Sequence, residues 1–133
     1  MAEGYAKKYT DYEVFSAGTQ KSYVNKNAIR VMAEDGIDIS SHTSKTISDL
    51  KDKNFSKVFT LCSDADSKCP LIFNGLTTHV GFQDPPSLTK SLKDKDEQLK
   101  IFRKVRDQIK KFILNIEEYI WYFQNLFNTV TMS

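Results

Sequence analysis

The sequence predicts an α/β fold in which a parallel sheet is flanked by helices. Two short runs of strand length, 57–62 (KVFTLC) and 78–82 (THVGF), alternate along the chain with segments of helical pattern. From about Asp94 onward, apolar residues recur at intervals of three and four, the pattern of a long amphipathic helix. Strands that alternate with helices form parallel sheets covered by helices, and chemistry gathers at the carboxyl ends of their strands.

The first half of the chain predicts three helices and one strand. In chain order these are a helix over 2–9, a strand over 12–15, a helix over 26–35 and a short helix over 48–53. The strand stops at the turn sequence Ser16-Ala17-Gly18. Asn25 is placed to cap the second helix and Gly36 to end it, because asparagine accepts amide hydrogen bonds and glycine tolerates a left-handed backbone.

In the second half, both predicted strands end beside residues that can carry chemistry. The run 57–62 reads as a continuous apolar strand, buried on both faces, and it ends at Cys62. The run 78–82 stops at Asp84-Pro85-Pro86, because two prolines cannot continue a strand ladder. In the long final helix, the apolar face is formed by Leu99, Phe102, Val105, Ile109, Phe112, Ile113 and Ile116.

The composition is that of one soluble domain. The chain has 133 residues, of which 40% are hydrophobic and 27% charged, and its net charge of +2 gives no reason to expect a nucleic-acid partner. No apolar stretch approaches the roughly 18 to 20 residues of a membrane span, and the N-terminus shows no signal peptide. We therefore expect a cytoplasmic protein, in which two cysteines are free, catalytic or redox-active rather than a structural disulfide.

Cys62 and Cys69 are the first candidates for a functional site. Six residues lie between them, so on a regular helix the sulfurs would stand about two turns, or roughly 10 Å, apart. A disulfide requires Cα atoms within about 7 Å, so the segment would have to unwind to form one. The spacing alone leaves open that these are two ordinary thiols, one in the core and one on a loop.

Asp84 and His42 are further candidates. Asp84 follows a predicted strand and could donate a proton to a leaving group, although Asp-Pro more often marks a turn. His42 could orient a loop through hydrogen bonds or serve as a structural histidine. Because His79 is the only other histidine and no C-x-x-C motif is present, the sequence predicts no zinc site and no cofactor.

Seven stretches, taken in order, resemble the thioredoxin-coupled arsenate reductases, which share the Rossmann-like fold of the low-molecular-weight protein tyrosine phosphatases. They are MAEGYAKKY at 1–9, FSAGT at 15–19, VNKNAI at 24–29, GIDISSHTS at 36–44, FTLCSDADSKCP at 59–70, HVGFQDP at 79–85 and FRKVRDQIKKFI at 102–113. The resemblance implies a phosphatase-like domain over 1–115. Residues 116–133 would then be an additional hydrophobic extension that prolongs the last helix, fills space beside the sheet or drives self-association.

The resemblance also implies roles for three residues. Cys62 would attack a cysteine–arsenate adduct and release arsenite, and Cys69 would then close a Cys62–Cys69 disulfide that thioredoxin reduces. Asp84 is similar to the family's general acid. The cysteine pair favours the reductases over a phosphatase-like protein, which would have no use for it. The implied partners are arsenate and thioredoxin, with neither nucleic acid nor a membrane.

The family's nucleophile loop has no match in these residues. The family carries its nucleophilic cysteine in a C-x5-R loop between the first strand and first helix, ending just before the position of Met1. Here the residues six positions beyond the two cysteines are Lys68 and Gly75. We therefore expect the chain to lack the first strand and this loop and to be inactive as it stands. A non-catalytic thiol partner and an unstable gene remnant are the alternatives.

Lys45 is the second departure from the family pattern. Some family members hold potassium close to the residues that match Glu3 and Ser16, helped by an acidic residue where this chain has Lys45. We expect the Lys45 ammonium to take the place of the cation beside Glu3, with Ser16 and His42 supporting the same site. The resemblance therefore predicts no potassium requirement and no metal ligand.

Overall fold

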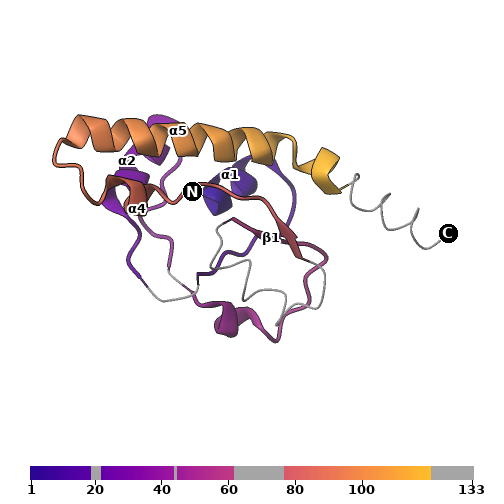
Figure 1. The fold of residues 1–133 in the computed structure, drawn as a ribbon. Helices are drawn as coiled ribbons and strands as arrows, with labels where there is room; N and C mark the ends of the chain where they lie inside the picture. The colour runs from indigo at the N-terminus through magenta and orange to yellow at the C-terminus, as the bar shows by residue number, and fades with distance from the viewer. Residues whose placement is uncertain (19–21, 44, 62–76, 121–133) are drawn as a thin grey trace.

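The computed structural model describes residues 1–18, 22–43, 45–61 and 77–120 (Figure 1). Its elements are α1 (Ala2–Tyr9), α2 (Lys26–Glu34), the 3-10 helix η1 (Ile47–Leu50), β1 (Val58–Thr60), β2 (Thr77–His79), α4 (Pro85–Thr89) and α5 (Lys95–Leu114). The strands β1 and β2 pair in parallel. The predicted α/β class, with a parallel sheet flanked by helices and a long C-terminal helix, is confirmed.

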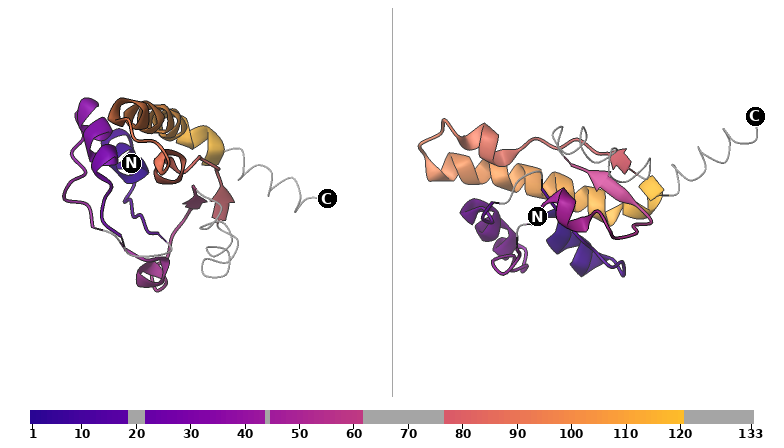
Figure 2. Two further views of the ribbon diagram at one scale, coloured as in Figure 1. Left: turned by 60° about the vertical axis from the view of Figure 1, so that its left-hand side comes forward. Right: turned by 90° about the horizontal axis from the view of Figure 1, so that it is seen from below.

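The long helix α5 organises the core. It crosses one side of the molecule, and α1, α2 and α4 all pack against it (Figures 1 and 2). Its buried apolar residues follow the predicted three- and four-residue spacing and are Leu99, Phe102, Val105, Ile109, Phe112 and Ile113. Tyr5 of α1 and Met32 of α2 are fully buried in the same cluster. The periodicity of the sequence therefore identified the core stripe of α5 correctly.

The helix α2 begins and ends close to where the sequence predicts. The Asn25 side chain accepts the amide hydrogen of Asn27 at 2.8 Å. The helix ends at Glu34, one residue early, and Gly36 follows with a φ of 73°, a left-handed conformation that favours glycine. The short helix predicted over 48–53 is the 3-10 helix η1, which starts at a capping box.

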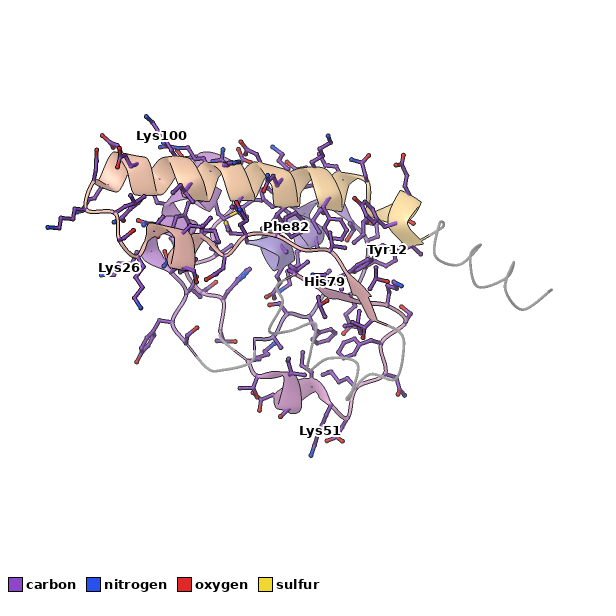
Figure 3. All side chains as sticks on the ribbon, viewed as in Figure 1. Tyr12, Lys26, Lys51, His79, Phe82 and Lys100 are labelled. Atoms are coloured by element: carbon purple, nitrogen blue, oxygen red, sulfur yellow. The ribbon has the colours of Figure 1, made fainter. Side chains whose placement is uncertain are left out.

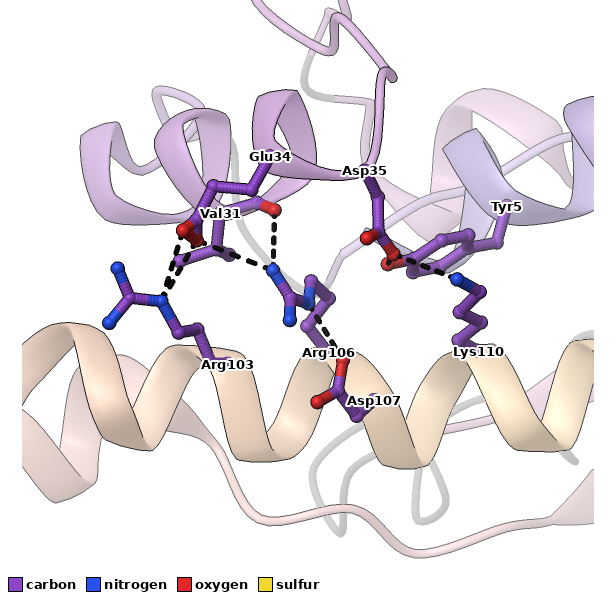
Figure 4. Close-up of polar contacts among 8 residues, drawn as sticks. All are labelled: Tyr5, Val31, Glu34, Asp35, Arg103, Arg106, Asp107 and Lys110. Carbon is purple, nitrogen blue, oxygen red and sulfur yellow. Dashed lines mark hydrogen bonds and ion pairs between the residues drawn. The ribbon is translucent and has the colours of Figure 1, made fainter.

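A buried arginine joins α5 to α2 (Figure 4). Arg106 is 9% exposed, and its Nη1 donates to the Val31 carbonyl at 2.9 Å and to Glu34 Oε1 at 3.3 Å. The last four carbonyls of a helix have no donor within the helix, and Val31 carries one of these in α2. Arg106 therefore satisfies the C-terminal end of α2 from the neighbouring helix.

The carboxylate of Asp35 joins three helices (Figure 4). The Tyr5 hydroxyl donates to its Oδ2 at 2.6 Å, and Lys110 Nζ donates to the same oxygen at 3.1 Å. The hydrogen bond from Tyr5 lowers the pKa of Asp35 and, together with that from Lys110, outweighs the effect of burial. Burial first, and then the Asp35 carboxylate, raise the pKa of the Tyr5 phenol. One charged group thus fixes α1 and α5 to the end of α2.

Residues 12–15 do not form the predicted strand. A strand needs ladder hydrogen bonds to a neighbour, and the described part of the chain supplies none to this segment. The pairing found here is a single parallel bridge between Gly18 and Thr46, made by the Gly18 amide to the Lys45 carbonyl at 2.9 Å and the Ile47 amide to the Gly18 carbonyl at 3.0 Å. The prediction failed because the alternation indicates an extended chain but cannot provide its partner.

The strand β1 is shorter and less covered than its apolar run suggested. It spans Val58–Thr60 instead of 57–62, and only Thr60 is buried. The ring of the half-buried Phe59 packs edge-on against Phe112 of α5, with centroids 5.2 Å apart. The expectation of a strand buried on both faces was therefore wrong for most of β1, because burial depends on neighbours that the run itself does not specify.

Pro85 and Pro86 begin a helix, whereas the second strand, expected over 78–82, spans Thr77–His79 and ends before them. The strand β2 ends at His79, and Asp84 then caps α4 by accepting the Ser87 amide hydrogen at 3.1 Å. Proline is favoured in the first turn of a helix, because its missing N–H would have no partner there and its φ is already helical. We predicted only the end of the strand from Asp84-Pro85-Pro86 and missed α4.

Candidate functional site

The carboxyl ends of β1 and β2 lie side by side and define the candidate site (Figure 3). Backbone pairing continues past the strands, from the Val80 amide to the Thr60 carbonyl at 2.8 Å and from the Phe82 amide to the Leu61 carbonyl at 2.9 Å. Asp84 follows Phe82 by two residues. The loop that leads to Asp84 is therefore fastened to the segment that continues β1.

Both predicted cysteines lie outside the described residues. Cys62 directly follows Leu61, whose carbonyl holds the Asp84 loop. Cys69 follows within the same undescribed range, 62–76. The roles implied for the two thiols, and the disulfide between them, therefore stay predictions.

The sequence left open whether Asp84 is a proton donor or a turn residue, and the structure places it at the turn that begins α4. Its side chain is exposed, and its Oδ2 accepts hydrogen bonds from the amide and the hydroxyl of Ser87. Because both bonds go to Oδ2, Oδ1 is the oxygen available to a substrate or a proton. The buried Pro85 next to it restricts the backbone, so the carboxyl group is held at a defined helix start. The structure thus shows Asp84 as the residue that begins α4, and its role as a proton donor stays a prediction.

Glu3, Ser16 and His42, three of the residues expected to support the site, lie together beside the start of α1. The Ser16 hydroxyl donates to the Glu3 carboxylate, Lys7 Nζ donates to it at 2.6 Å, and His42 Nδ1 lies 3.9 Å from it. Burial alone would raise the pKa of Glu3, but the hydrogen bonds from Lys7 and Ser16 outweigh it and lower the pKa. The cluster therefore holds Glu3 as a carboxylate.

The structure gives the place beside Glu3 to Lys7 instead of Lys45. The Lys45 ammonium lies 5.9 Å from the centre of the Phe15 ring. Lys7 pairs with Glu3 because residues four apart are neighbours on a helix surface. The expectation for Lys45 is therefore corrected, and the signal we missed was the spacing of Glu3 and Lys7 within a predicted helix.

Replacing Glu3 by glutamine should flatten the acid limb of the stability profile. The folded pKa of Glu3 lies below its ordinary value of 4.5, so its contribution is present above that value and lost as the pH falls through the folded pKa. We expect E3Q to lose about 1 kcal/mol near neutral pH, because the removed carboxylate accepts charge-assisted bonds. Thermal melts from acid to neutral pH measure this. Parallel profiles for E3Q and the unaltered chain would contradict the assignment.

Within the described ranges, no group of three His, Cys, Asp or Glu side chains is arranged to hold a metal ion. None of the helices in those ranges is both long enough and apolar enough to cross a bilayer. The candidate site in the described residues comprises the carboxyl ends of β1 and β2, Asp84, and the cluster of Glu3, Ser16 and His42.

The sequence of the chain matches the family model of the low molecular weight phosphotyrosine protein phosphatases over residues 1–120. The chain belongs to this family, which confirms the family resemblance noted in the sequence.

Arsenate reductases are among the curated relatives and the solved structures to which this chain is similar. The arsenate reductase of Staphylococcus aureus (strain Newman) is 46% identical over 120 residues, covering 88% of this chain and 85% of the relative. That of Halalkalibacterium halodurans is 41% identical over 121 residues, covering 89% and 85%. A solved arsenate reductase in its oxidized state has a TM-score of 0.68 at 30% identity, covering 86% of this chain and 82% of that one. The predicted phosphatase-like fold is thereby confirmed.

Proposed function

We propose that this protein is an arsenate reductase that converts arsenate to arsenite through cysteine thiols restored by thioredoxin. The observation that carries the proposal is the pairing at the ends of β1 and β2, which brings the residue before Cys62 against the loop of Asp84. The similarity to arsenate reductases supports the choice of substrate. Dithiol chemistry of this kind needs a reducing compartment, which supports a cytoplasmic location.

The proposed cycle balances two electrons. A thiolate in a C-x5-R loop forms a cysteine–arsenate adduct, and Asp84 gives its proton to the departing oxygen, which leaves as water. Cys62 then attacks the sulfur of the adduct, so that a disulfide forms and arsenic leaves as arsenite with the electron pair of the sulfur–arsenic bond. Cys69 attacks Cys62, which frees the first thiolate and closes the Cys62–Cys69 disulfide. Thioredoxin reduces that disulfide by thiol exchange.

The 133 residues by themselves supply only the later steps. They contain no C-x5-R motif, because Lys68 and Gly75 stand where its arginine would be. Backbone amides and an arginine are needed to hold the oxyanion and to lower the thiol pKa from about 8.5. We therefore infer that this polypeptide alone does not turn over arsenate. Residues 116–133 are proposed to lie outside the catalytic domain, which we place over 1–115.

The test compares the 133-residue polypeptide with the same polypeptide preceded, in frame, by a strand and a C-x5-R loop of the family pattern. We expect arsenite formation coupled to thioredoxin oxidation in the extended form only. Its rate should exceed that of the extended Cys62→Ser, Cys69→Ser control by at least about a hundred-fold, because the control keeps the oxyanion loop but lacks the thiols that release arsenite and restore the nucleophile.

Two results would contradict the proposal. Turnover by the unextended polypeptide well above its own cysteine-free control would show that the argument from the loop is wrong. An extended form that folds and binds arsenate but forms no arsenite would remove the assignment as a reductase. Continued reduction of its Cys62–Cys69 disulfide by thioredoxin would then support a non-catalytic thiol partner.

Potassium should not stabilise the protein. The Lys7 ammonium already lies 2.6 Å from the Glu3 carboxylate, so a cation would have to displace an existing ion pair. We expect equal melting temperatures in equimolar potassium and sodium chloride, since a ligand that does not bind the folded state cannot raise its stability. A rise with potassium alone, measured by thermal unfolding, would show that a cation site is present.

A further inference from the structure

We propose that His79 is a positioning residue that fastens the Asp84 loop to the end of β1. The proposal rests on the proposed role of Asp84 as the proton donor. His79 Nδ1 lies 2.9 Å from the hydroxyl oxygen of Thr60, within hydrogen-bond distance. The two residues are direct partners in the parallel register and occupy the last position of each strand.

The pair lies on the face of the sheet that α5 does not cover. Phe59, the neighbour of Thr60 along β1, packs its ring against Phe112 of α5. Successive side chains of a strand point to opposite faces, so Thr60 and its partner His79 point away from α5. Phe112 of α5 contacts both Phe59 and Phe82 on the other face. On this face, the hydrogen bond between the Thr60 and His79 side chains adds to the backbone bonds that join the two segments.

The second ring nitrogen of His79 constrains the loop itself. A Cβ added to Gly81 would lie only 3.1 Å from His79 Nε2, so the loop approaches the imidazole this closely because residue 81 has no side chain. On either side of Gly81, the Val80 amide donates to the carbonyl of Thr60, the last residue of β1, and the Phe82 amide donates to the carbonyl of Leu61. The imidazole thus lies against the loop at Gly81, at the corner that the loop forms with β1.

The position of Asp84 relative to β1 is set from two sides, by α4, which packs against α5, and by the corner that His79 forms with the loop. Its bond to Ser87 fixes the carboxyl group to α4, but only residues 80–83 connect it with β2. A proton donor must come within about 3 Å of the oxygen that it protonates. A displacement of about 1 Å can cost a hundred-fold in rate. A side chain that fixes this loop against β1 therefore controls whether Asp84 can act.

Four variants separate the hydrogen bond from the volume of the side chains. His79→Leu fills similar space without a polar atom, whereas His79→Asn places an amide where Nδ1 lies. Thr60→Val removes the hydroxyl, and Thr60→Ser keeps it. If the bond is what matters, His79→Leu and Thr60→Val should behave alike, and the two conservative variants should resemble the unaltered protein.

The first measurement is amide hydrogen exchange by NMR in the 133-residue polypeptide, which requires no arsenate. We expect His79→Leu and Thr60→Val to speed exchange of the Phe82 amide by about ten-fold or more relative to Ile109 in α5, because the opening is local. His79→Asn and Thr60→Ser should stay within about three-fold of the unaltered chain. Unchanged exchange at Phe82 would overturn the proposal. An equal rise at Ile109 would do so as well, since it would show a global effect.

The second measurement is arsenate reduction by the polypeptide extended with the C-x5-R loop. We expect His79→Leu to lower kcat about ten-fold with little change in KM, because the C-x5-R loop, and not Asp84, binds the oxyanion. His79→Asn should restore most of kcat. A change in KM alone, or failure of His79→Asn to restore kcat, would overturn the proposal. If the unaltered extended form is inactive, the proposed function fails, while hydrogen exchange still decides the role of His79.

Discussion

Replacing Arg106 by alanine should lower the free energy of unfolding by about 3 kcal/mol, because it removes a buried donor from two acceptors and deletes its packed stem. The Val31 carbonyl would lose its hydrogen bond from Arg106 Nη1 at 2.9 Å, and α2 has no backbone N–H at its C-terminal end to replace it. The bond to Asp107 adds little, since that carboxylate is 62% exposed and the pair is screened by water. Urea unfolding of both proteins measures the difference.

Arg103→Ala is the matched control for Arg106→Ala. Arg103 lies on the same helix and pairs with the same residue, Glu34, but its side chain is 39% exposed. Exposed ion pairs contribute less than about 1 kcal/mol, so this variant should be nearly as stable as the unaltered chain. Equal losses for the two variants would contradict the assignment of Arg106 as the connection between α5 and the end of α2.

In the extended polypeptide, Cys69→Ser should stop arsenate reduction after a single turnover. Without the Cys69 thiol, the disulfide between Cys62 and the nucleophile cannot be exchanged for a Cys62–Cys69 disulfide. The nucleophilic cysteine therefore stays oxidised. Rapid-quench measurement of arsenite should show one equivalent per chain followed by no further release. The same preparation should contain the mixed disulfide by mass spectrometry.

Cys62→Ser provides the contrast, because it removes the thiol that breaks the adduct. This variant should release no arsenite in the first turnover, although arsenate still binds. Sustained turnover in Cys69→Ser would show that thioredoxin reduces the first disulfide directly, and the proposed relay would then be wrong. Release of a full equivalent by Cys62→Ser would contradict the role of Cys62 in the same way.

Most of the candidate site could be named from the sequence, but its geometry could not. Asp84, Glu3, Ser16 and His42 were identified from motifs, and the last three do come together at one carboxylate. The Thr60–His79 pair was missed, because neither residue type signals a contact across 19 positions of chain. The only clue was that both residues lie within runs of strand length.

The sequence by itself determined α1, α2 and α5, but not α4. Asn25 and Gly36 mark the limits of α2, and the spacing of apolar residues marks the buried stripe of α5. These features depend on hydrogen bonds and side-chain spacing within a few residues, so they are present in the local sequence.

Only the tertiary structure decided which distant residues meet. Among the described residues it left 12–15 without a strand partner, and it placed Arg106 at the end of α2. Ladder hydrogen bonds and buried charges are satisfied by groups far along the chain, and their energy depends on whether those groups arrive together. No local pattern contains that information, because the partner is supplied by the fold.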